Sequence, residues 1–327
     1  MTELIRSRFI LGAVLALCIT ATILLLLYGI SSPRDLQTVT HQEGAIFVWE
    51  RQRDYLGGGY ALHPTENRLL YIGQDNGIYM KDLGTGEATL LLKEADGLDV
   101  FEILSFSNDG SKILFIASGG TTAYPSNIYV LEVNTSKIKR LTKTEFVGER
   151  SQGSMIYYDK VFTFAEFSSD DKRILFGFDD HTLSVSLLGI MNADGSGMTV
   201  LTEGQPISWS SGGESVYYFS DGKLWRMDLA KRQKEQILLE EKPLAFSPTR
   251  TAAVVKKHDQ LFTEDLNAPG SAVGLAIVST RRSATDPSIQ LDLSSVRWQR
   301  NGQHILLVYE SNLLERIEVR QIDAIKN

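Results

Sequence analysis

The stretch that decides the fold is Phe106-Ser107-Asn108-Asp109-Gly110-Ser111-Lys112-Ile113-Leu114-Phe115. A bulky residue opens it, a short polar turn follows, and a nearly continuous apolar run ends it. Asp-Gly pairs tolerate the positive φ angles of tight turns, so Asp109-Gly110 predicts a hairpin between two strands. The apolar run predicts that the second strand is buried on both faces, as it is when a small sheet is sandwiched between neighbours.

The same pattern recurs along the chain, six times in all. The residues that open the repeats are Leu62, Phe106, Phe167, Trp209, Phe246 and Trp298. Successive openers lie about 37 to 61 residues apart, which brackets the roughly 40 to 45 residues of a four-stranded propeller blade. The sequence therefore predicts an all-β fold, a six-bladed β-propeller of four-stranded antiparallel blades. We expect each opener to wedge between adjacent sheets.

A polar residue stands at a similar place in the third strand of every repeat. These residues are Asp82, Glu132, Asn192, Asp228, Asp265 and Glu318. Carboxylate pairs also serve glycosidases, but a residue that every blade repeats is better explained as a solvated or turn-capping group. The segment 45–49 can supply the outer strand that the last repeat lacks, so we expect the two ends of the propeller to pair and cover an exposed edge.

Residues 9–30 form an uncharged, apolar run that is long enough to cross a hydrocarbon core of about 30 Å as a helix. Arg6 and Arg8 precede the run, which places the N-terminus in the cytoplasm. We therefore expect a cytoplasmic segment 1–8, a transmembrane helix 9–30, a linker 31–44 and a propeller 45–327 on the extracytoplasmic side, in the periplasm or at the cell surface. The alternative is a cleaved signal peptide, although the apolar run of a signal peptide is usually shorter than this one.

Two further sets of residues match a known family. Met191-Asn192-Ala193-Asp194-Gly195-Ser196-Gly197 through Leu201-Thr202 resembles the third strand, Asp-Gly hairpin and closing Leu-Thr pair of TolB-like propellers, and Arg140-Leu141-Thr142 repeats that closing pair. Residues 106–115 resemble the aromatic-Ser-Pro-Asp-Gly blade motif of the same family, with Asn108 in place of proline. TolB-like blades are themselves similar to WD-repeat blades. The resemblance covers about residues 45–325 and implies the propeller fold, but no single activity, because propellers serve receptors, accessory proteins and enzymes.

Composition excludes several functions. An apolar content of 43% is too high for a disordered tail, and a net charge of −7 without a basic block predicts no nucleic-acid partner. Cys18, the single cysteine, lies inside the apolar run, so no intrachain disulfide or cysteine metal site can form. The five histidines are scattered singly, so we expect no metal and no cofactor. No Gly-x-Ser-x-Gly elbow, phosphate-binding glycine loop or His-Glu-x-x-His helix is present, and we predict no catalytic residue.

The predicted binding surface lies on one face of the ring. Loops that join the second strand to the third share this face with the loops between blades, and they carry exposed aromatic and charged residues of the kind that interfaces favour. The candidate residues are Tyr124, Phe146, Arg150, Tyr157, Tyr158, Asp180, His181, Arg281 and Arg282. The alternative is that these aromatic side chains pack under their own loops.

Two function hypotheses follow. The first is a membrane-anchored extracytoplasmic propeller that binds a protein or glycan partner without catalysis, with the N-terminal helix as its membrane contact. The second is an enzyme of hydrolase or lyase type, with its site in the central funnel of the propeller.

Overall fold

The computed structural model describes most of the chain beyond residue 43. The described residues are 44–50, 60–66, 68–73, 77–82, 85–93, 98–119, 126–149, 156–239, 241–247, 249, 251–266, 272–278, 280–282, 290–298, 304–311 and 316–323. The predicted cytoplasmic segment, the predicted transmembrane helix 9–30 and nearly all of the predicted linker lie outside them. Within the described residues, no helix has the length and hydropathy that crossing a bilayer requires.

Five antiparallel sheets of four strands follow one another along the chain, and we number them blades 1 to 5. Blade 1 consists of β2 (Tyr60–Leu62), β3 (Arg68–Ile72), β4 (Ile78–Asp82) and β5 (Ala88–Leu92), and blade 2 of β6 (Leu98–Phe106), β7 (Lys112–Gly119), β8 (Asn127–Glu132) and β9 (Lys137–Arg140). Blade 3 consists of β12 (Lys160–Phe167), β13 (Arg173–Asp180), β14 (Val185–Asn192) and β15 (Thr199–Glu203). Blade 4 consists of β16 (Gln205–Trp209), β17 (Ser215–Ser220), β18 (Lys223–Asp228) and β19 (Lys234–Ile237), and blade 5 of β20 (Pro243–Phe246), β21 (Ala252–Lys257), β22 (Gln260–Asp265) and β23 (Val273–Val278).

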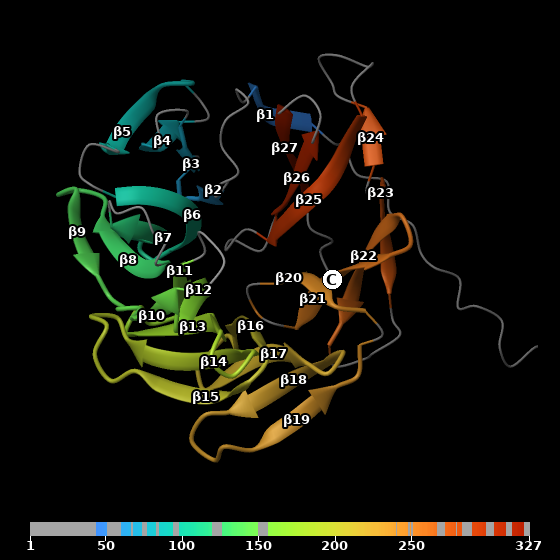
Figure 1. Cartoon of the computed structure of the whole chain (residues 1–327). Helices are drawn as coiled ribbons and strands as arrows, with labels where there is room; N and C mark the ends of the chain where they lie inside the picture. Colours follow the sequence, from blue (N-terminus) through green and yellow to red (C-terminus); the bar gives the residue numbers. More distant parts are fainter. Residues whose placement is uncertain are drawn as a thin grey trace, which may run out of the picture.

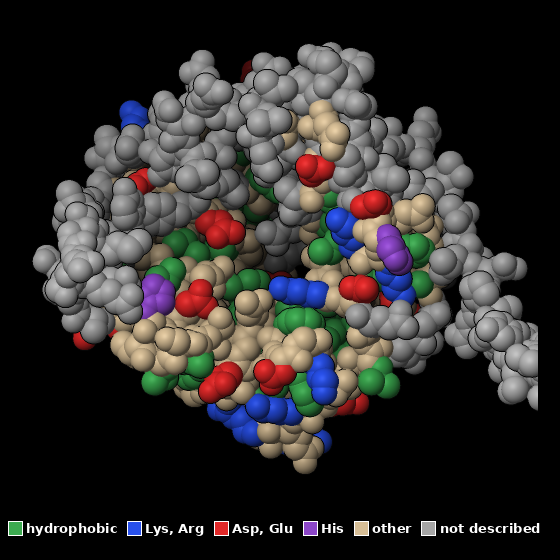
Figure 2. All heavy atoms as spheres, turned by 45° about the vertical axis from the view of Figure 1, so that its right-hand side comes forward, with side chains coloured by type: hydrophobic (Ala, Val, Ile, Leu, Met, Phe, Trp, Pro, Cys, Tyr) green, Lys and Arg blue, Asp and Glu red, His purple; other side chains and the backbone are tan. Residues whose placement is uncertain are grey.

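The sheets are arranged around a common centre in chain order, with the first strand of each blade innermost (Figure 1). Figure 2 shows a hollow near this centre, with acidic and basic side chains around it. Because each sheet is too thin to bury its own apolar residues, it must pack against its neighbours. The expected propeller class and the expected four-stranded antiparallel blades are confirmed.

The remaining large sheet, which we call the closing sheet, joins the two ends of the propeller. It contains β24 (Thr280–Arg282), β25 (Gln290–Trp298), β26 (His304–Ser311), β27 (Arg316–Asp323) and β1 (Gly44–Glu50). Strand β1 pairs antiparallel with β27, with Trp49 opposite Ile317 and Phe47 opposite Val319, so the expected pairing of the two ends is confirmed. The prediction of six four-stranded blades is wrong in its count: five such sheets are present, and the closing sheet has five strands because β24 joins it beside β25.

The apolar cores lie between neighbouring blades. Clusters of buried residues join blades 1 and 2, 2 and 3, 3 and 4, and 4 and 5, and another joins blade 5 to the closing sheet. Phe106, Phe167, Trp209 and Phe246, which open four of the repeats, are each at most 5% exposed and belong to these clusters. Phe246 of blade 5 stacks on Tyr217 of blade 4 with ring centroids 5.0 Å apart. These openers therefore wedge between sheets as expected.

The turns between the first two strands of blades 2 and 3 are linked to each other. The backbone N–H of Asn108 donates to both carboxylate oxygens of Asp171, at 2.7 and 2.9 Å, and the Asn108 side chain donates to the carbonyl of Ser168 at 2.7 Å. Gly110 has a φ of 74°, and Asp171 occupies the corresponding position of blade 3 with a φ of 56°. Aspartate tolerates this left-handed conformation better than most residues, and here its carboxylate joins two blades.

Candidate functional site at the seam of blades 3 and 4

The seam between blades 3 and 4 is closed at its inner end by Trp209. Its indole Nε1 donates to the carbonyl of Glu166 at 3.0 Å, and its backbone N–H donates to Oε2 of the same residue at 3.1 Å. The Arg173 guanidinium lies 4.9 Å from the centre of the Trp209 ring and donates to the carbonyl of Gly213 at 2.7 Å. These contacts exclude water from the inner half of the seam.

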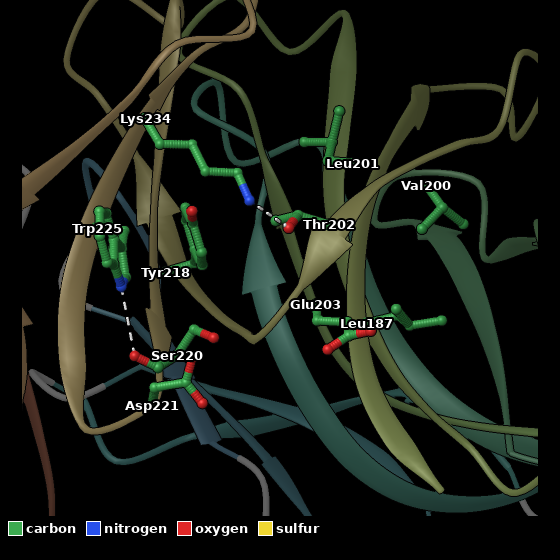
Figure 3. A pocket seen from close by; sticks show the side chains of 10 residues that line it. All are labelled: Leu187, Val200, Leu201, Thr202, Glu203, Tyr218, Ser220, Asp221, Trp225 and Lys234. Atoms are coloured by element: carbon green, nitrogen blue, oxygen red, sulfur yellow. Dashed lines mark hydrogen bonds between the residues drawn. The ribbon is translucent and has the colours of Figure 1, made fainter. Parts of the chain in front are cut away.

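The outer end of the same seam opens into a cleft of about 600 Å³. Strands β14 and β15 form one wall, and β17, β18, β19 and the turn between β17 and β18 form the other (Figure 3). The lining residues are Leu187, Val200, Leu201, Thr202, Glu203, Tyr218, Ser220, Asp221, Trp225 and Lys234. Aromatic, aliphatic and charged side chains therefore meet in one hollow.

Two aromatic side chains line the blade 4 wall. Tyr218 is 1% exposed and packs in the core of the seam, and burial raises its pKa, so the phenol is neutral at physiological pH. Trp225 is half-buried, and its indole Nε1 donates to the carbonyl of Ser220 at 3.3 Å, which fixes the ring orientation. Lys234 Nζ donates to Thr202 Oγ1 at 2.8 Å and bridges the two walls.

Two exposed carboxylates, Glu203 and Asp221, stand on opposite walls of the cleft (Figure 3). Asp221 and Gly222 both have positive φ angles, 52° and 72°, between paired residues Ser220 and Lys223, which is the two-residue type I′ hairpin that Asp-Gly favours. Carboxylates beside an aromatic ring can bind the cationic side chain of a peptide or the hydroxyl groups of a sugar.

The structure brings five of the predicted binding residues together. Strands β10 (Phe146–Glu149) and β11 (Ile156–Tyr158) form a separate hairpin, with Phe146 opposite Tyr158 and Tyr157 beside it. The backbone of His181 donates to the carbonyl of Asp159 at 3.0 Å, so the turn that carries Asp180 and His181 is bonded to this hairpin.

Within that turn, Asp180 has a capping role. Its Oδ1 accepts the Thr182 hydroxyl at 2.6 Å and the backbone N–H groups of Thr182 and Leu183, and the Thr182 hydroxyl is the main reason that its pKa is lowered. His181 is exposed, and Leu183 is 65% exposed. Arg281 and Arg282 lie on β24 of the closing sheet, apart from this turn in the chain and in the ring (Figure 1). Tyr124 and Arg150 lie outside the described residues.

Among the polar residues predicted to recur in the third strands, Asp82 and Asp228 cap turns, as expected. Oδ1 of Asp228 accepts the backbone N–H groups of Ala230 and Lys231 at 3.0 and 2.8 Å, and Oδ1 of Asp82 accepts that of Thr85 at 2.9 Å. The prediction for Glu318 is wrong. The residue that ends the third strand of the closing sheet is Asp323, paired with His304 as Asn192 is with Arg173 in blade 3.

The cleft was not predicted from the sequence, although a short segment of the sequence carries a signal for one of its walls. Ser220-Asp221-Gly222-Lys223 is a type I′ turn signal, and Trp225 follows it at the strand position that faces the cleft. His63 has a structural role: its Nδ1 accepts the backbone N–H of Glu66 at 3.1 Å in a hairpin. Among the described residues, no three His, Cys, Asp or Glu side chains come together as a metal site would require.

The arrangement defines the class of this protein as an all-β propeller with four-stranded antiparallel blades. No protein-family model and no curated protein sequence matches the chain. Among solved structures, an oligogalacturonate lyase in complex with manganese is similar, with a TM-score of 0.55 at 11% identity, covering 84% of this chain and 79% of that one.

Two other solved structures share the fold. The calcium-binding protein regucalcin from Agrobacterium tumefaciens gives a TM-score of 0.52 at 10% identity, covering 88% of this chain and 97% of that one. TolB from Acinetobacter baumannii gives a TM-score of 0.50 at 14% identity, and the match covers 85% of this chain and 66% of that one. At these identities the likenesses show the propeller fold alone, and they agree with the TolB-like resemblance at that level.

Proposed function

We propose that this propeller binds a protein or glycan partner without catalysis. The observation that carries the proposal is the cleft at the outer end of the seam between blades 3 and 4. Its volume of about 600 Å³ falls in the range of ligand pockets, and apolar and polar groups line it in equal measure. Half-buried Trp225 offers an indole face, the kind of anchor that dominates binding energies.

The cleft and the predicted binding face support one continuous binding region. Glu203 and Asp221 stand where the loops between blades and the loops from second to third strands emerge, and Asp180 and His181 occupy the corresponding turn of blade 3. A rigid scaffold that presents long loops is where binding residues concentrate. The hairpin of β10 and β11, which carries Phe146, Tyr157 and Tyr158, adjoins this turn through the backbone bond from His181 to Asp159.

Binding is tested on the full chain in lipid nanodiscs, with a glycan array and a random-peptide phage library as probes. We expect ligands whose affinity falls about tenfold in Trp225→Ala, since truncating a central aromatic anchor has effects of this size. Leu238→Ala, which alters a side chain that is 68% exposed elsewhere on blade 4, serves as the matched control and should bind normally. Recovery of no ligand, or equal binding by Trp225→Ala, would contradict the proposal.

The enzyme hypothesis makes a different prediction. Glu102 is an exposed carboxylate on β6, the innermost strand of blade 2. Turnover of a glycoside or peptide substrate that Glu102→Gln abolishes, with the fold intact, would replace the non-catalytic proposal with a catalytic one.

We also propose that residues 9–30 anchor the propeller outside the cytoplasm. Replacing Cys18 by serine and placing a cysteine at Lys231, in an exposed turn of blade 4, gives a single reporter thiol. A maleimide that cannot cross membranes should label this thiol once the outer permeability barrier is opened. Labelling only after lysis of the inner membrane would place the propeller in the cytoplasm.

A further inference from the structure

The outer strands of the blades differ in how well they are protected. Blades 1 to 4 have outer strands whose side chains are all described, namely β5, β9, β15 and β19. Unpaired strand edges invite other chains to pair with them, and natural edges are commonly protected by charges, lysine above all. Strand β9 carries Lys137, Lys139 and Arg140, and β19 carries Lys234 and Glu235. Both edges are therefore protected.

Strand β15 lacks this protection. It has no charge from Thr199 to Thr202, and Val200 is 48% exposed, with Met198 just before the strand at 43%. Strand β5 is also uncharged, but it carries none of the large apolar side chains that are exposed among the described residues. Of these four edges, β15 alone combines four successive uncharged residues with an exposed large apolar side chain.

The unprotected edge adjoins the cleft. Val200, Leu201, Thr202 and Glu203 of β15 all line it (Figure 3). The strand has a bulge at Leu201, because Thr202 pairs with Leu188 while Val200 pairs with Gly189. Bulges re-aim side chains and are frequent beside functional sites. A strand added to β15 would direct alternate side chains toward blade 4, where the cleft lies.

We propose that β15 accepts an extended peptide segment of a protein partner as an added strand, with a lysine or arginine side chain of that segment in the cleft. The inference rests on the proposed binding function and names its ligand class. Backbone N–H and C=O groups of β15 match a peptide rather than a sugar, and Val200 offers an apolar contact. Glu203 and Asp221 supply two negative charges against the one positive charge of Lys234, whose ammonium group donates to the neutral hydroxyl of Thr202, so the cleft carries a net negative charge. The Trp225 ring adds a surface that favours a cation.

The test uses the tightest peptide recovered from the phage library and the full chain in nanodiscs. Hydrogen exchange followed by mass spectrometry should show that this peptide slows exchange of backbone amides within 199–203 and leaves those of 234–237, on the protected edge, unchanged. A sugar or a peptide that binds through side chains alone would not protect a strand edge in this way. Binding without protection at 199–203 overturns the inference.

Substitutions give a second readout. Val200→Lys places a protecting charge on the edge and should weaken binding about tenfold, whereas Leu238→Lys, an equally large change at an exposed site off the edge, should not. Glu203→Gln should weaken binding about threefold and reduce its dependence on salt, as expected for an exposed charge at the rim. Replacing the lysine or arginine of the peptide by norleucine should remove that salt dependence. Urea midpoints of all variants should match that of the wild type.

The outcomes separate this inference from the proposed function. If the library yields no peptide while glycans bind in a Trp225-dependent manner, the binding function stands and the peptide inference is wrong. If neither probe binds, both fail. If a peptide binds and Val200→Lys leaves its affinity unchanged, the edge of β15 is not the docking strand.

Discussion

The two ends of the seam between blades 3 and 4 are built differently. At the inner end, Trp209 is 2% exposed and is bonded twice to Glu166 of the neighbouring blade. At the outer end, the same two blades separate into a cleft where Trp225 is only half-buried. Because blades radiate from a centre, neighbouring sheets diverge outward, so side chains that fill the inner seam leave room at the outer one. Stability and binding can therefore be assigned to opposite ends of one interface.

The largest expected effect is on stability at the inner end. Trp209→Ala should lower the free energy of unfolding by about 3 to 5 kcal/mol, since it removes a large buried side chain and leaves a cavity. Trp225→Ala, the matched change at the outer end, should lower it by less, about 1 to 2 kcal/mol, because Trp225 is only half-buried although it packs against the same core cluster. Urea unfolding of both variants measures the difference. Equal losses would mean that the cleft is part of the core.

The next effect concerns the link between blades 2 and 3. Asp171→Ala removes the acceptor of the Asn108 backbone N–H and places alanine at a φ of 56°, so we expect a loss of about 2 to 3 kcal/mol. Asp171→Gly removes the same bonds without the strained φ and should cost about 1 kcal/mol less. If the two variants unfold at the same urea concentration, the φ angle contributes nothing.

A smaller effect should appear at acid pH. Hydrogen bonds from the hydroxyls of Ser111 and Ser107 lower the pKa of Asp109 from 3.8 to about 2 in the folded chain. The depressed value means that the stabilisation is complete above about pH 4 and is lost as pH falls toward 2. Asp109→Asn should therefore be less stable than wild type at pH 5, and this gap should narrow as pH falls from about 4 to 2. A gap at pH 2 as large as that at pH 5 would show that the carboxylate charge is not the cause.

Much of the fold could be predicted from the sequence because the blade repeat is local. The opener, the turn and the apolar strand lie within about ten residues, as in residues 106–115, and the pairing of the chain ends followed from a strand left over before the first repeat. The register of β27 could not be read in this way. Polar and apolar residues alternate from Arg316 to Arg320, so Glu318 resembles the polar residue that ends a third strand. The pairing of β27 with β26 and β1 shows that Asp323 is the residue at the strand end.

The candidate site was less predictable because two blades build it. The turn at Asp221-Gly222 has a local signal, but the exposure of Val200 depends on how far blades 3 and 4 separate, which no short window of sequence encodes. The predicted binding residues Phe146, Tyr158 and His181 lie together because they are close in the chain and because Asp159 joins the hairpin to the turn.

The most direct test of this division is one pair of measurements on Trp225→Ala in the full chain: its urea midpoint and its affinity for the tightest ligand from the peptide and glycan libraries. We predict an unfolding midpoint well above that of Trp209→Ala and an affinity about tenfold weaker than that of the wild type. Unchanged affinity, or a midpoint as low as that of Trp209→Ala, would contradict the account.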